Sequence, residues 1–320
     1  IQNSEFYVTA SAGVAVYPID GEDAETLIKN ADFAMYSAKS KGKNQSAFCS
    51  PDMKNDVMKK MKLTNNLYRA LEKNELFLHY QPQVKVETGK ITGFEALLRW
   101  NNEEYGDVPP ELFIPLAEIT GLIKPIGLWV FKTVCELCKI CRLSFGDDFR
   151  ISINISIEQL EDKDFINQIR ELLHDTGTDA ANIQIEIKES VAFKDEPFLL
   201  QHIHDLKNIG FTIAIDGFGT GYSSFSRLKV FPIDLIKIDM EFVRGISAKS
   251  QKDKAITKSI IQISKNLGIK ALAVGVETEE EFMFLKEHDC DEIQGFYFFE
   301  PMPYNELRAF LNESNLQKNV

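Results

Sequence analysis

The chain has 320 residues, a length that fits two domains or one large barrel with an appendage. It carries 36 Lys and Arg against 48 Asp and Glu, a formal net charge of −12, which disfavours a basic surface for nucleic acid polymers. With 44% hydrophobic residues the chain can form a full core, yet no apolar run reaches the ~18–20 residues of a membrane span. An anionic small ligand fits this composition only if basic groups or a metal are placed locally.

The first 74 residues carry few elements. Residues 5–18 are β-rich, and apolar spacing predicts one helix over 23–39 and another over 52–73. A segment this short cannot form a self-sufficient core. We therefore expect 1–50 to be a fragment of a larger domain and 51–74 to be a connector helix. Because the sequence opens in what looks like the middle of a domain, we expect upstream sensory or membrane domains to be missing from it.

From residue 75 onward, short apolar runs alternate with helical patterns, which predicts a mainly parallel sheet. Eight such runs within 75–320 indicate an irregular (β/α)8 barrel of the TIM type. The first two runs are joined only by the turn at 87–89, too short for a helical crossover, so this pair should be antiparallel. The predicted strands are 76–81, 91–98, 150–154, 183–187, 211–215, 234–238, 270–275 and 293–298. The predicted helices are 112–142, 157–176, 196–208, 251–267, 278–288 and 303–314.

Seven of the predicted strands carry a polar residue in or directly after the apolar run. A single one could be a strand-end cap or a solvated side chain. Residues at the carboxyl ends of barrel strands converge on one mouth, so their recurrence favours a shared site. The seven residues are Glu95, Asn154, Glu186, Asp216, Lys237, Glu277 and Gln294.

Hard oxygen donors dominate this set: Glu95, Asn154, Glu186 and Asp216. Three carboxylates and one amide suit Mg²⁺ or Mn²⁺ better than zinc, because no Cys or His is among them. Lys237 and Arg99 would bring positive charge to the same mouth. The pattern predicts a metal-assisted phosphate site. The glycine-rich segment 216–224 does not have the spacing of a dinucleotide-binding loop, and we expect a mobile loop over the mouth.

The ordered motifs of residues 75–315 resemble the EAL-domain family, bacterial cyclic di-GMP phosphodiesterases and their inactive relatives. The motif that names the family is Phe94-Glu-Ala-Leu-Leu-Arg-Trp100. The match extends through Tyr80-Gln-Pro82, 113–122, Asn154-Ile-Ser156, 186–190, 218–224, Lys237-Ile-Asp239, 275–278 and Gln294-Gly295. Residues 5–48 resemble the C-terminal end of a GGDEF domain, an α+β fold. Its name-giving Gly-Gly-Asp-Glu-Phe motif is absent, so no cyclase activity is assigned to this chain.

The resemblance implies a barrel that binds cyclic di-GMP at its mouth and opens it to linear pGpG with Mg²⁺ or Mn²⁺. The implied ligands of the first metal are Glu95, Asn154, Glu186 and Asp216. Lys237 would position or polarise the attacking water and the phosphate, and Glu277 would lie in the polar rim or the metal shell. The residues implied to contact the dinucleotide are Gln81, Leu97, Arg99 and Gln294. Glu189 would anchor the mobile loop.

Two positions depart from the pattern of family members that hydrolyse. These members read Asp-Asp-Phe-Gly-Thr-Gly, whereas Gly217 replaces the second Asp, which ordinarily binds a second metal. They also read Ala-Glu-Gly-Val-Glu, whereas Val274 replaces the first Glu, a metal ligand or general base in that resemblance. Losing a general base costs ~10²–10⁴ in rate and losing an electrostatic stabiliser ~10²–10³. We expect one metal ion, a lost second site, and slow or no hydrolysis.

The favoured interpretation is a degenerate EAL domain that binds cyclic di-GMP as a receptor or regulatory module. The alternatives are an active metal-dependent cyclic di-GMP phosphodiesterase that yields pGpG, and a nucleotide-free barrel for protein interaction. The resemblance also makes a homodimer an expectation. The odd number of cysteines, five, favours reduced thiols and a cytoplasmic location, with membrane anchoring of the full-length protein left open.

Overall fold

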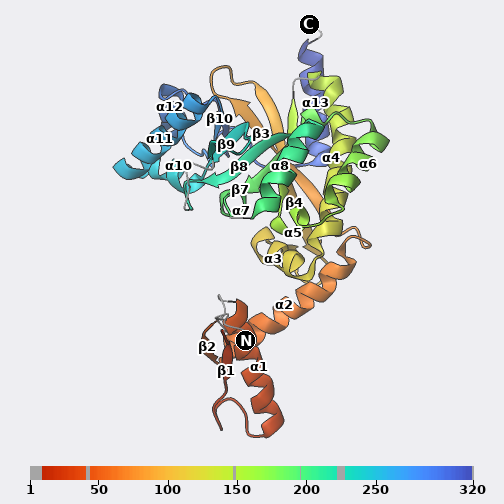
Figure 1. Cartoon of the computed structure of the whole chain (residues 1–320), viewed down its shortest axis with the longest axis vertical. Helices are drawn as coiled ribbons and strands as arrows, with labels where there is room; N and C mark the ends of the chain where they lie inside the picture. The colour runs from red at the N-terminus through yellow and green to blue at the C-terminus, as the bar shows by residue number, and fades with distance from the viewer. Residues whose placement is uncertain (1–8, 41–43, 147–148, 195, 222–227, 319–320) are drawn as a thin grey trace, which may run out of the picture. The chain divides into compact units, whose positions relative to one another are not determined.

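The computed structural model divides the chain into two compact units, Ile1–Lys73 and Asn74–Val320, and each is described here by itself (Figure 1). The structure describes residues 9–40, 44–146, 149–194, 196–221 and 228–318. Part of the β-rich segment predicted over 5–18 therefore lies outside the described residues, as does the end of the 218–224 motif.

The first unit contains a small parallel sheet with a helix against it. Strand β1 (Ala12–Val14) pairs in parallel with β2 (Ser46–Phe48). Helices α1 (Ala24–Ser40) and α2 (Pro51–Ala70) lie close to the predicted ranges. A Cβ at Gly13 would come within 1.8 Å of the Ala31 carbonyl oxygen, so the glycine allows α1 to pack directly on β1.

The second unit is a closed barrel of eight strands with additional strands at its margin. The order around the barrel is β3-β11-β10-β9-β8-β7-β6-β4, and the pairing of β3 with β4 closes it. The barrel strands are β3 (Leu76–Lys85), β4 (Ile91–Asn102), β6 (Arg150–Ile155), β7 (Ile183–Lys188), β8 (Thr212–Phe218), β9 (Leu235–Ile238), β10 (Lys270–Val274) and β11 (Glu292–Gln294). Two short strands, β5 (Gly106–Val108) and β12 (Met302–Pro303), pair with β4 and β3.

The predicted irregularity of the barrel is confirmed. Strand β3 is antiparallel to both of its barrel neighbours, β4 and β11, whereas the other barrel pairings are parallel. In this register Gln81 lies opposite Glu95. Strand β11 pairs with β3 only through residues 292–293, and β12 pairs with a different part of β3.

Helices surround the barrel, with α4 and α13 adjacent on one side of it (Figure 1). The side-chain hydroxyl of Ser144 on α4 donates a hydrogen bond of 3.5 Å to the carbonyl oxygen of Leu311 on α13. The helices of this unit within the described residues include α3 (Pro110–Thr120), α4 (Ile123–Phe145), α5 (Ile157–Leu160), α6 (Phe165–Thr176), α7 (Glu189–Ala192), α8 (Pro197–Ile209), α10 (Met240–Ser247), α11 (Gln251–Leu267), α12 (Glu279–Glu287) and α13 (Tyr304–Lys318). A 3-10 turn covers Ala180–Asn182.

Three element predictions were wrong in detail. The single helix expected over 157–176 is two helices, α5 and α6, because the chain leaves the helical conformation after Leu160 and resumes it at Phe165. The single helix expected over 112–142 is two helices, because Gly121 takes the left-handed conformation (φ 75°) and ends α3. The strand expected over 293–298 stops at Gln294. Beyond it the chain turns, with the N–H groups of Phe298 and Phe299 donating to the Gly295 carbonyl oxygen.

Within the described residues, no helix taken alone combines the length and the hydropathy needed to cross a membrane. Helices α3 and α4 pass that test only as a pair, and they are bent by 117° at the break between them.

The interior of the barrel is divided into an apolar half and a polar half. The apolar half is a cluster of Ala214, Leu235 and Leu272, with Val274 packed against it. The polar half begins at the amino ends of the parallel strands, where Arg150 forms a salt bridge with Glu292. Both side chains are largely removed from solvent, with 11% and 2% exposed.

Neighbouring groups hold Glu292 in its ionised form. Burial alone would raise its pKa, but the Arg150 guanidinium, Lys270 and the hydrogen bond donated by Thr92 bring the pKa below its usual range. A carboxyl group whose pKa is lowered by folding stabilises the fold above its unfolded-state pKa, and that contribution disappears as the pH falls through the folded-state pKa. The Arg150–Glu292 pair should therefore stabilise the barrel at neutral pH and lose this effect in acid.

We predict that Glu292→Gln lowers the free energy of unfolding by about 3 kcal/mol at pH 7, because Arg150 would keep its buried charge without a counter-charge. Urea unfolding followed by circular dichroism at pH 7 and at pH 3.5 measures this. The difference from the unaltered chain should shrink at the lower pH. In the control, Glu87→Gln removes the carboxylate that lies 3.0 Å from Lys85 at the surface, and should change the free energy by less than about 0.5 kcal/mol. An equal deficit of Glu292→Gln at both pH values would contradict the assignment.

Candidate functional site

Five of the predicted site residues meet inside the mouth of the barrel. Lys237 on β9 is their centre: its Nζ lies 2.8 Å from Glu95 Oε2, 2.5 Å from Glu186 Oε2 and 3.8 Å from Asp216 Oδ1. The side-chain amide of Asn154 donates a 2.7 Å hydrogen bond to Glu95 Oε1. The five residues come from β4, β6, β7, β8 and β9, and we call them the Lys237 cluster.

The strand register explains why these side chains meet. Successive residues of a strand point to opposite faces, so residues in register on neighbouring strands share the barrel interior. Asn154 is in register with Glu186, and Asp216 lies two residues beyond Ala214, which is in register with Glu186. A one-residue shift of any strand would turn its polar side chain out of the mouth.

The cluster holds more carboxylate than the ammonium can balance. Burial would raise the pKa of Glu95, but the charge of Lys237 and the hydrogen bonds that the carboxylate accepts keep it below its usual range. Burial and the charge of Glu95 raise the pKa of Glu186 to about 8. Burial also disfavours the charged form of Lys237, but the facing carboxylates outweigh this and raise its pKa. The fold therefore favours the protonated form of Glu186 and the charged forms of Glu95 and Lys237.

The donors of the cluster suit a hard divalent cation. Within the described part of the chain, no group of three or more His, Cys, Asp or Glu is already arranged around a metal position, and the carboxylates instead face the ammonium of Lys237. One buried oxygen, Glu186 Oε1, has no hydrogen-bond partner among the described residues. A buried carboxylate oxygen without a donor is costly unless a cation or a proton binds it. The residues present thus fit Mg²⁺ or Mn²⁺, bound with release of the Glu186 proton.

Gln81 and Gln294 extend the cluster toward β3 and β11. The Gln294 amide donates to Glu95 Oε2 at 2.7 Å and to Gln81 Oε1 at 2.9 Å, and Gln81 donates to the Phe299 carbonyl oxygen at 3.1 Å. Both glutamines are buried. Both amide nitrogens thus donate inside the protein, Gln294 twice and Gln81 once. The predicted contact with a dinucleotide would have to form alongside these bonds or replace one.

Leu97 and Arg99 lie on β4 at the mouth, opposite His79 and Phe77 of β3. Arg99 is half-buried and donates from Nη1 to the Leu98 carbonyl oxygen at 2.9 Å. Burial lowers its pKa, and nearby acidic groups, including Glu95, oppose this. A guanidinium stays charged in proteins, so Arg99 supplies positive charge at the mouth.

Glu189 lies against the glycine-rich loop that follows β8. Its Oε2 accepts hydrogen bonds of 3.0 Å from the backbone N–H groups of Gly219 and Gly221. These are contacts that an anchor of this loop would need. Residues 222–227 of the loop lie outside the described residues, so the predicted movement over the mouth stays a prediction.

Two further carboxylates near the mouth have other partners. Glu277 receives a 2.7 Å hydrogen bond from Arg244 Nη2, and its side chain is 41% exposed. Asp239 caps helix α10 by accepting from the Glu241 N–H at 2.8 Å. Within the described residues, the structure pairs Glu277 with this arginine and not with the Lys237 cluster.

The two residues that depart from the family pattern lie beside the cluster. Gly217 directly follows Asp216 and has a φ of +68°, and a Cβ there would meet nothing closer than Asp239 Oδ2 at 3.6 Å. Val274 is in register with Gln294 and packs against the apolar half of the barrel. Neither position supplies a side-chain oxygen as a ligand.

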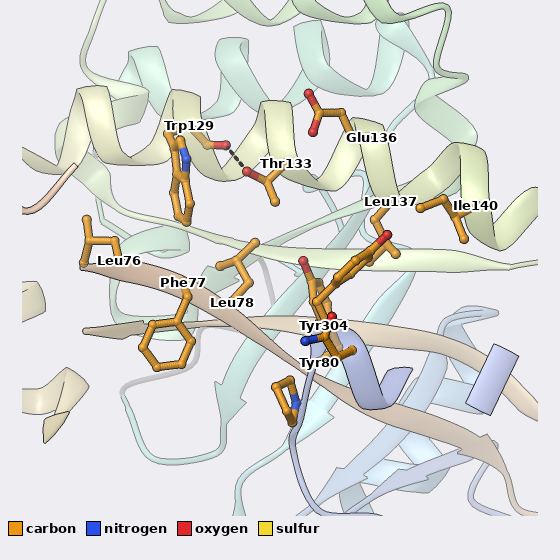
Figure 2. A pocket seen from close by; sticks show the side chains of 12 residues that line it. Leu76, Phe77, Leu78, Tyr80, Trp129, Thr133, Glu136, Leu137, Ile140 and Tyr304 are labelled. Atoms are coloured by element: carbon orange, nitrogen blue, oxygen red, sulfur yellow. Dashed lines mark hydrogen bonds between the residues drawn. The ribbon is translucent and has the colours of Figure 1, made fainter. Parts of the chain in front are cut away.

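A separate pocket of about 610 Å³ lies on the outer side of β3, between this strand, α4 and the start of α13 (Figure 2). Trp129, Leu137 and Ile140 of α4 face Tyr80 and Tyr304 across it. It shares no lining residue with the Lys237 cluster, so the convergence of charged groups, and not the size of a cavity, marks the candidate site.

The sequence analysis did not identify the buried polar residues that lie between the Lys237 cluster and the Arg150–Glu292 pair. Gln83 and Gln184 lie two residues before or after a predicted site residue on the same strand, and both are buried. The signal was the two-residue period of a strand, which places Gln83 on the same face as Gln81, and Gln184 on the same face as Glu186.

A profile of the EAL domain matches residues 64–301, and a profile of the diguanylate cyclase GGDEF domain matches residues 1–45. This chain belongs to the EAL-domain family. Phosphodiesterases of this family are metal-dependent.

Characterised relatives resemble this EAL-domain chain over most of its length. The bifunctional diguanylate cyclase/cyclic di-GMP phosphodiesterase MucR of Pseudomonas aeruginosa is 37% identical over 309 residues, covering 97% of this chain and 45% of MucR. The cyclic di-GMP phosphodiesterase PdeR of Escherichia coli is 37% identical over 299 residues, covering 93% of this chain and 45% of PdeR. The chain thus spans less than half the length of these relatives.

Solved structures agree with the EAL barrel. The PaMucR phosphodiesterase in complex with c-di-GMP superposes with a TM-score of 0.74 at 37% identity, covering 77% of this chain and 99% of that one. The EAL enzyme Bd1971, bound to cAMP and cyclic di-GMP, gives a TM-score of 0.75 at 32% identity, covering 80% of this chain and 70% of that one.

We predict that Glu186→Gln weakens Mn²⁺ binding at least about tenfold, because it removes one carboxylate from the cluster. Electron paramagnetic resonance of free Mn²⁺ measures the affinity. Glu281→Gln is the matched control: this glutamate is equally buried but serves the capping box of α12, and its substitution should leave Mn²⁺ affinity unchanged. Equal affinity in both variants would show that the metal binds elsewhere.

Proposed function

We propose that this EAL domain binds cyclic di-GMP at the mouth of its barrel as a receptor or regulatory module, with slow or no hydrolysis. The observation that carries the proposal is the Lys237 cluster, because four oxygen donors for one cation and a fixed ammonium remain together at a mouth that also holds Arg99. The relatives named for cyclic di-GMP phosphodiesterase activity and the PaMucR complex support this ligand.

One metal ion is proposed, Mg²⁺ or Mn²⁺, held by Glu95, Asn154, Glu186 and Asp216. When bound, such an ion supplies charge stabilisation at a phosphate oxygen and orients it. Lys237 would add its ammonium to the same phosphate, and Arg99 would contribute a second positive charge at the rim. These groups serve binding whether or not the phosphodiester is cleaved.

Slow hydrolysis is proposed because no carboxylate among the described residues takes the place of the missing acidic groups at positions 217 and 274. Two-metal hydrolysis places two ions ~3.5–4 Å apart to stabilise the attacking and the leaving oxygens together. The two nearby carboxylates that could compensate are engaged: Asp239 caps α10, and Glu277 pairs with Arg244. The homodimer, the domain boundaries at 50 and 74, and the upstream sensory or membrane part stay predictions.

The proposal predicts a 1:1 complex with cyclic di-GMP in calorimetric titration and little pGpG in a chromatographic assay with either Mg²⁺ or Mn²⁺. The double variant Gly217→Asp with Val274→Glu should hydrolyse at least about 100-fold faster. The space around position 217 accepts a side chain, and Asp is among the residues that tolerate its left-handed backbone.

The matched control is Gly217→Asn with Val274→Gln, which has nearly the same shape without the carboxylates and should show no gain. Rapid pGpG formation by the unaltered chain would replace the proposal by an active phosphodiesterase. Failure to bind cyclic di-GMP at millimolar concentration would instead favour a nucleotide-free interaction barrel.

A further inference from the structure

A chain of hydrogen bonds runs through the polar half of the barrel, from its amino end to the Lys237 cluster. Arg150 Nη2 donates to Gln83 Oε1 at 2.8 Å, and Gln83 Nε2 donates to Gln294 Oε1 at 3.2 Å. Gln294 Nε2 then donates to Glu95 Oε2 at 2.7 Å. The chain links residues from β6, β3, β11 and β4.

Each donor in this series of hydrogen bonds is directed toward the Glu95 end. The charged groups at the two ends of the series, Arg150 and Glu95, explain this common direction. A guanidinium can only donate, so Gln83 must turn its oxygen toward Arg150 and its N–H₂ toward Gln294. An ionised carboxylate can only accept, so Gln294 must turn its N–H₂ toward Glu95 and its oxygen toward Gln83. Side-chain amides are often ambiguous in orientation, but here both are fixed by the charged groups at the ends.

Arg150 is itself held in place. Glu292 forms a salt bridge with it, and Gln184 Oε1 accepts from its Nε at 3.3 Å. A Cβ at Gly93 would come within 2.4 Å of the Arg150 carbonyl oxygen and 2.8 Å of its Cγ, so the glycine on β4 leaves room for this arginine. The Arg150 end of this series of hydrogen bonds is therefore held in one orientation. That orientation can be transmitted through Gln83 and Gln294 to the Lys237 cluster.

We infer that Gln83 is a positioning residue for the ligand site: it transmits the fixed orientation of Arg150 to Gln294, whose amide then holds Glu95 Oε2 in its place beside Lys237. The inference rests on the proposed function, because Glu95 is a proposed ligand of the cation. Gln83 itself is fully buried on β3 and, unlike Gln294, has no hydrogen bond to Glu95 among the described residues.

The test is Gln83→Glu. The new carboxylate can still accept from Arg150 but has no N–H for Gln294 Oε1, so two acceptors would face each other and the Gln294 amide would turn. Gln294 Oε1 would then face the Glu95 carboxylate, and the two oxygen acceptors would repel each other. We expect cyclic di-GMP affinity, measured by calorimetry with Mg²⁺, to fall at least about tenfold.

The matched control is Gln184→Glu. Gln184 is equally buried, and its Oε1 accepts from the same Arg150 and from Ser152 at 3.0 Å, bonds that a carboxylate can keep. Among the described residues Gln184 makes no direct hydrogen bond to Gln294, so the affinity should stay within about twofold. The added buried charge should affect stability as it does in Gln83→Glu. Equal losses in the two variants would overturn the inference. If Gln83→Glu does not fold, Gln83→Met removes the donor to Gln294 Oε1 without adding a charge, and it should weaken cyclic di-GMP binding in the same direction.

A second readout does not depend on ligand binding. Nitrogen–proton spectra of the Gln294 side-chain amide, assigned with the Gln294→Met variant, should show slow proton exchange that Gln83→Glu removes and Gln184→Glu preserves. An unchanged Gln294 signal in Gln83→Glu would overturn the inference. If the signal responds as expected but the unaltered chain binds no cyclic di-GMP, the proposed function fails while the positioning of Glu95 by Gln83 stands.

Discussion

The balance of charge around one buried ammonium governs the site of this protein. Lys237 lies inside the barrel with Glu95 and Glu186 in direct contact and Asp216 further out. Removing so many ionisable groups from water is tolerable only when they compensate one another. The charge compensation is incomplete, because burial and the charge of Glu95 raise the pKa of Glu186. A bound divalent cation would complete it.

The same constraint shapes the remainder of the barrel interior. Polar side chains occupy one half and form a continuous network down to the Arg150–Glu292 pair, while Ala214, Leu235 and Leu272 fill the other half. A partly satisfied buried network destabilises a core, whereas a fully satisfied one fixes a single arrangement. The polar half thus both stabilises the barrel and orients the carboxylates of the Lys237 cluster. The apolar half extends as far as Val274 at the mouth.

Much of the fold could be predicted from the sequence. The alternation of apolar runs with helical patterns gave the barrel, and the short turn before Lys90 gave its antiparallel strand, because turn length limits the possible connections. The convergence of Glu95, Asn154, Glu186 and Asp216 followed from the barrel rule that strand ends share one mouth.

Other features required tertiary information. The break at Gly121 divides a long apolar pattern that periodicity alone reads as one helix, since a glycine is tolerated within helices as well as at their ends. The pairing of Glu277 with Arg244 joins the loop before α12 to helix α10, and no local sequence pattern connects the two residues. Gln83 directly follows the Tyr80-Gln-Pro82 motif, yet its role depends on residues from three other strands.

The most direct measurement of the central claim is anomalous diffraction at the manganese edge from crystals grown at neutral pH with Mn²⁺ and cyclic di-GMP. The account predicts one peak, bounded by the oxygens of Glu95, Asn154, Glu186 and Asp216 beside the Lys237 ammonium. Two peaks side by side, or no peak among these residues, would contradict it.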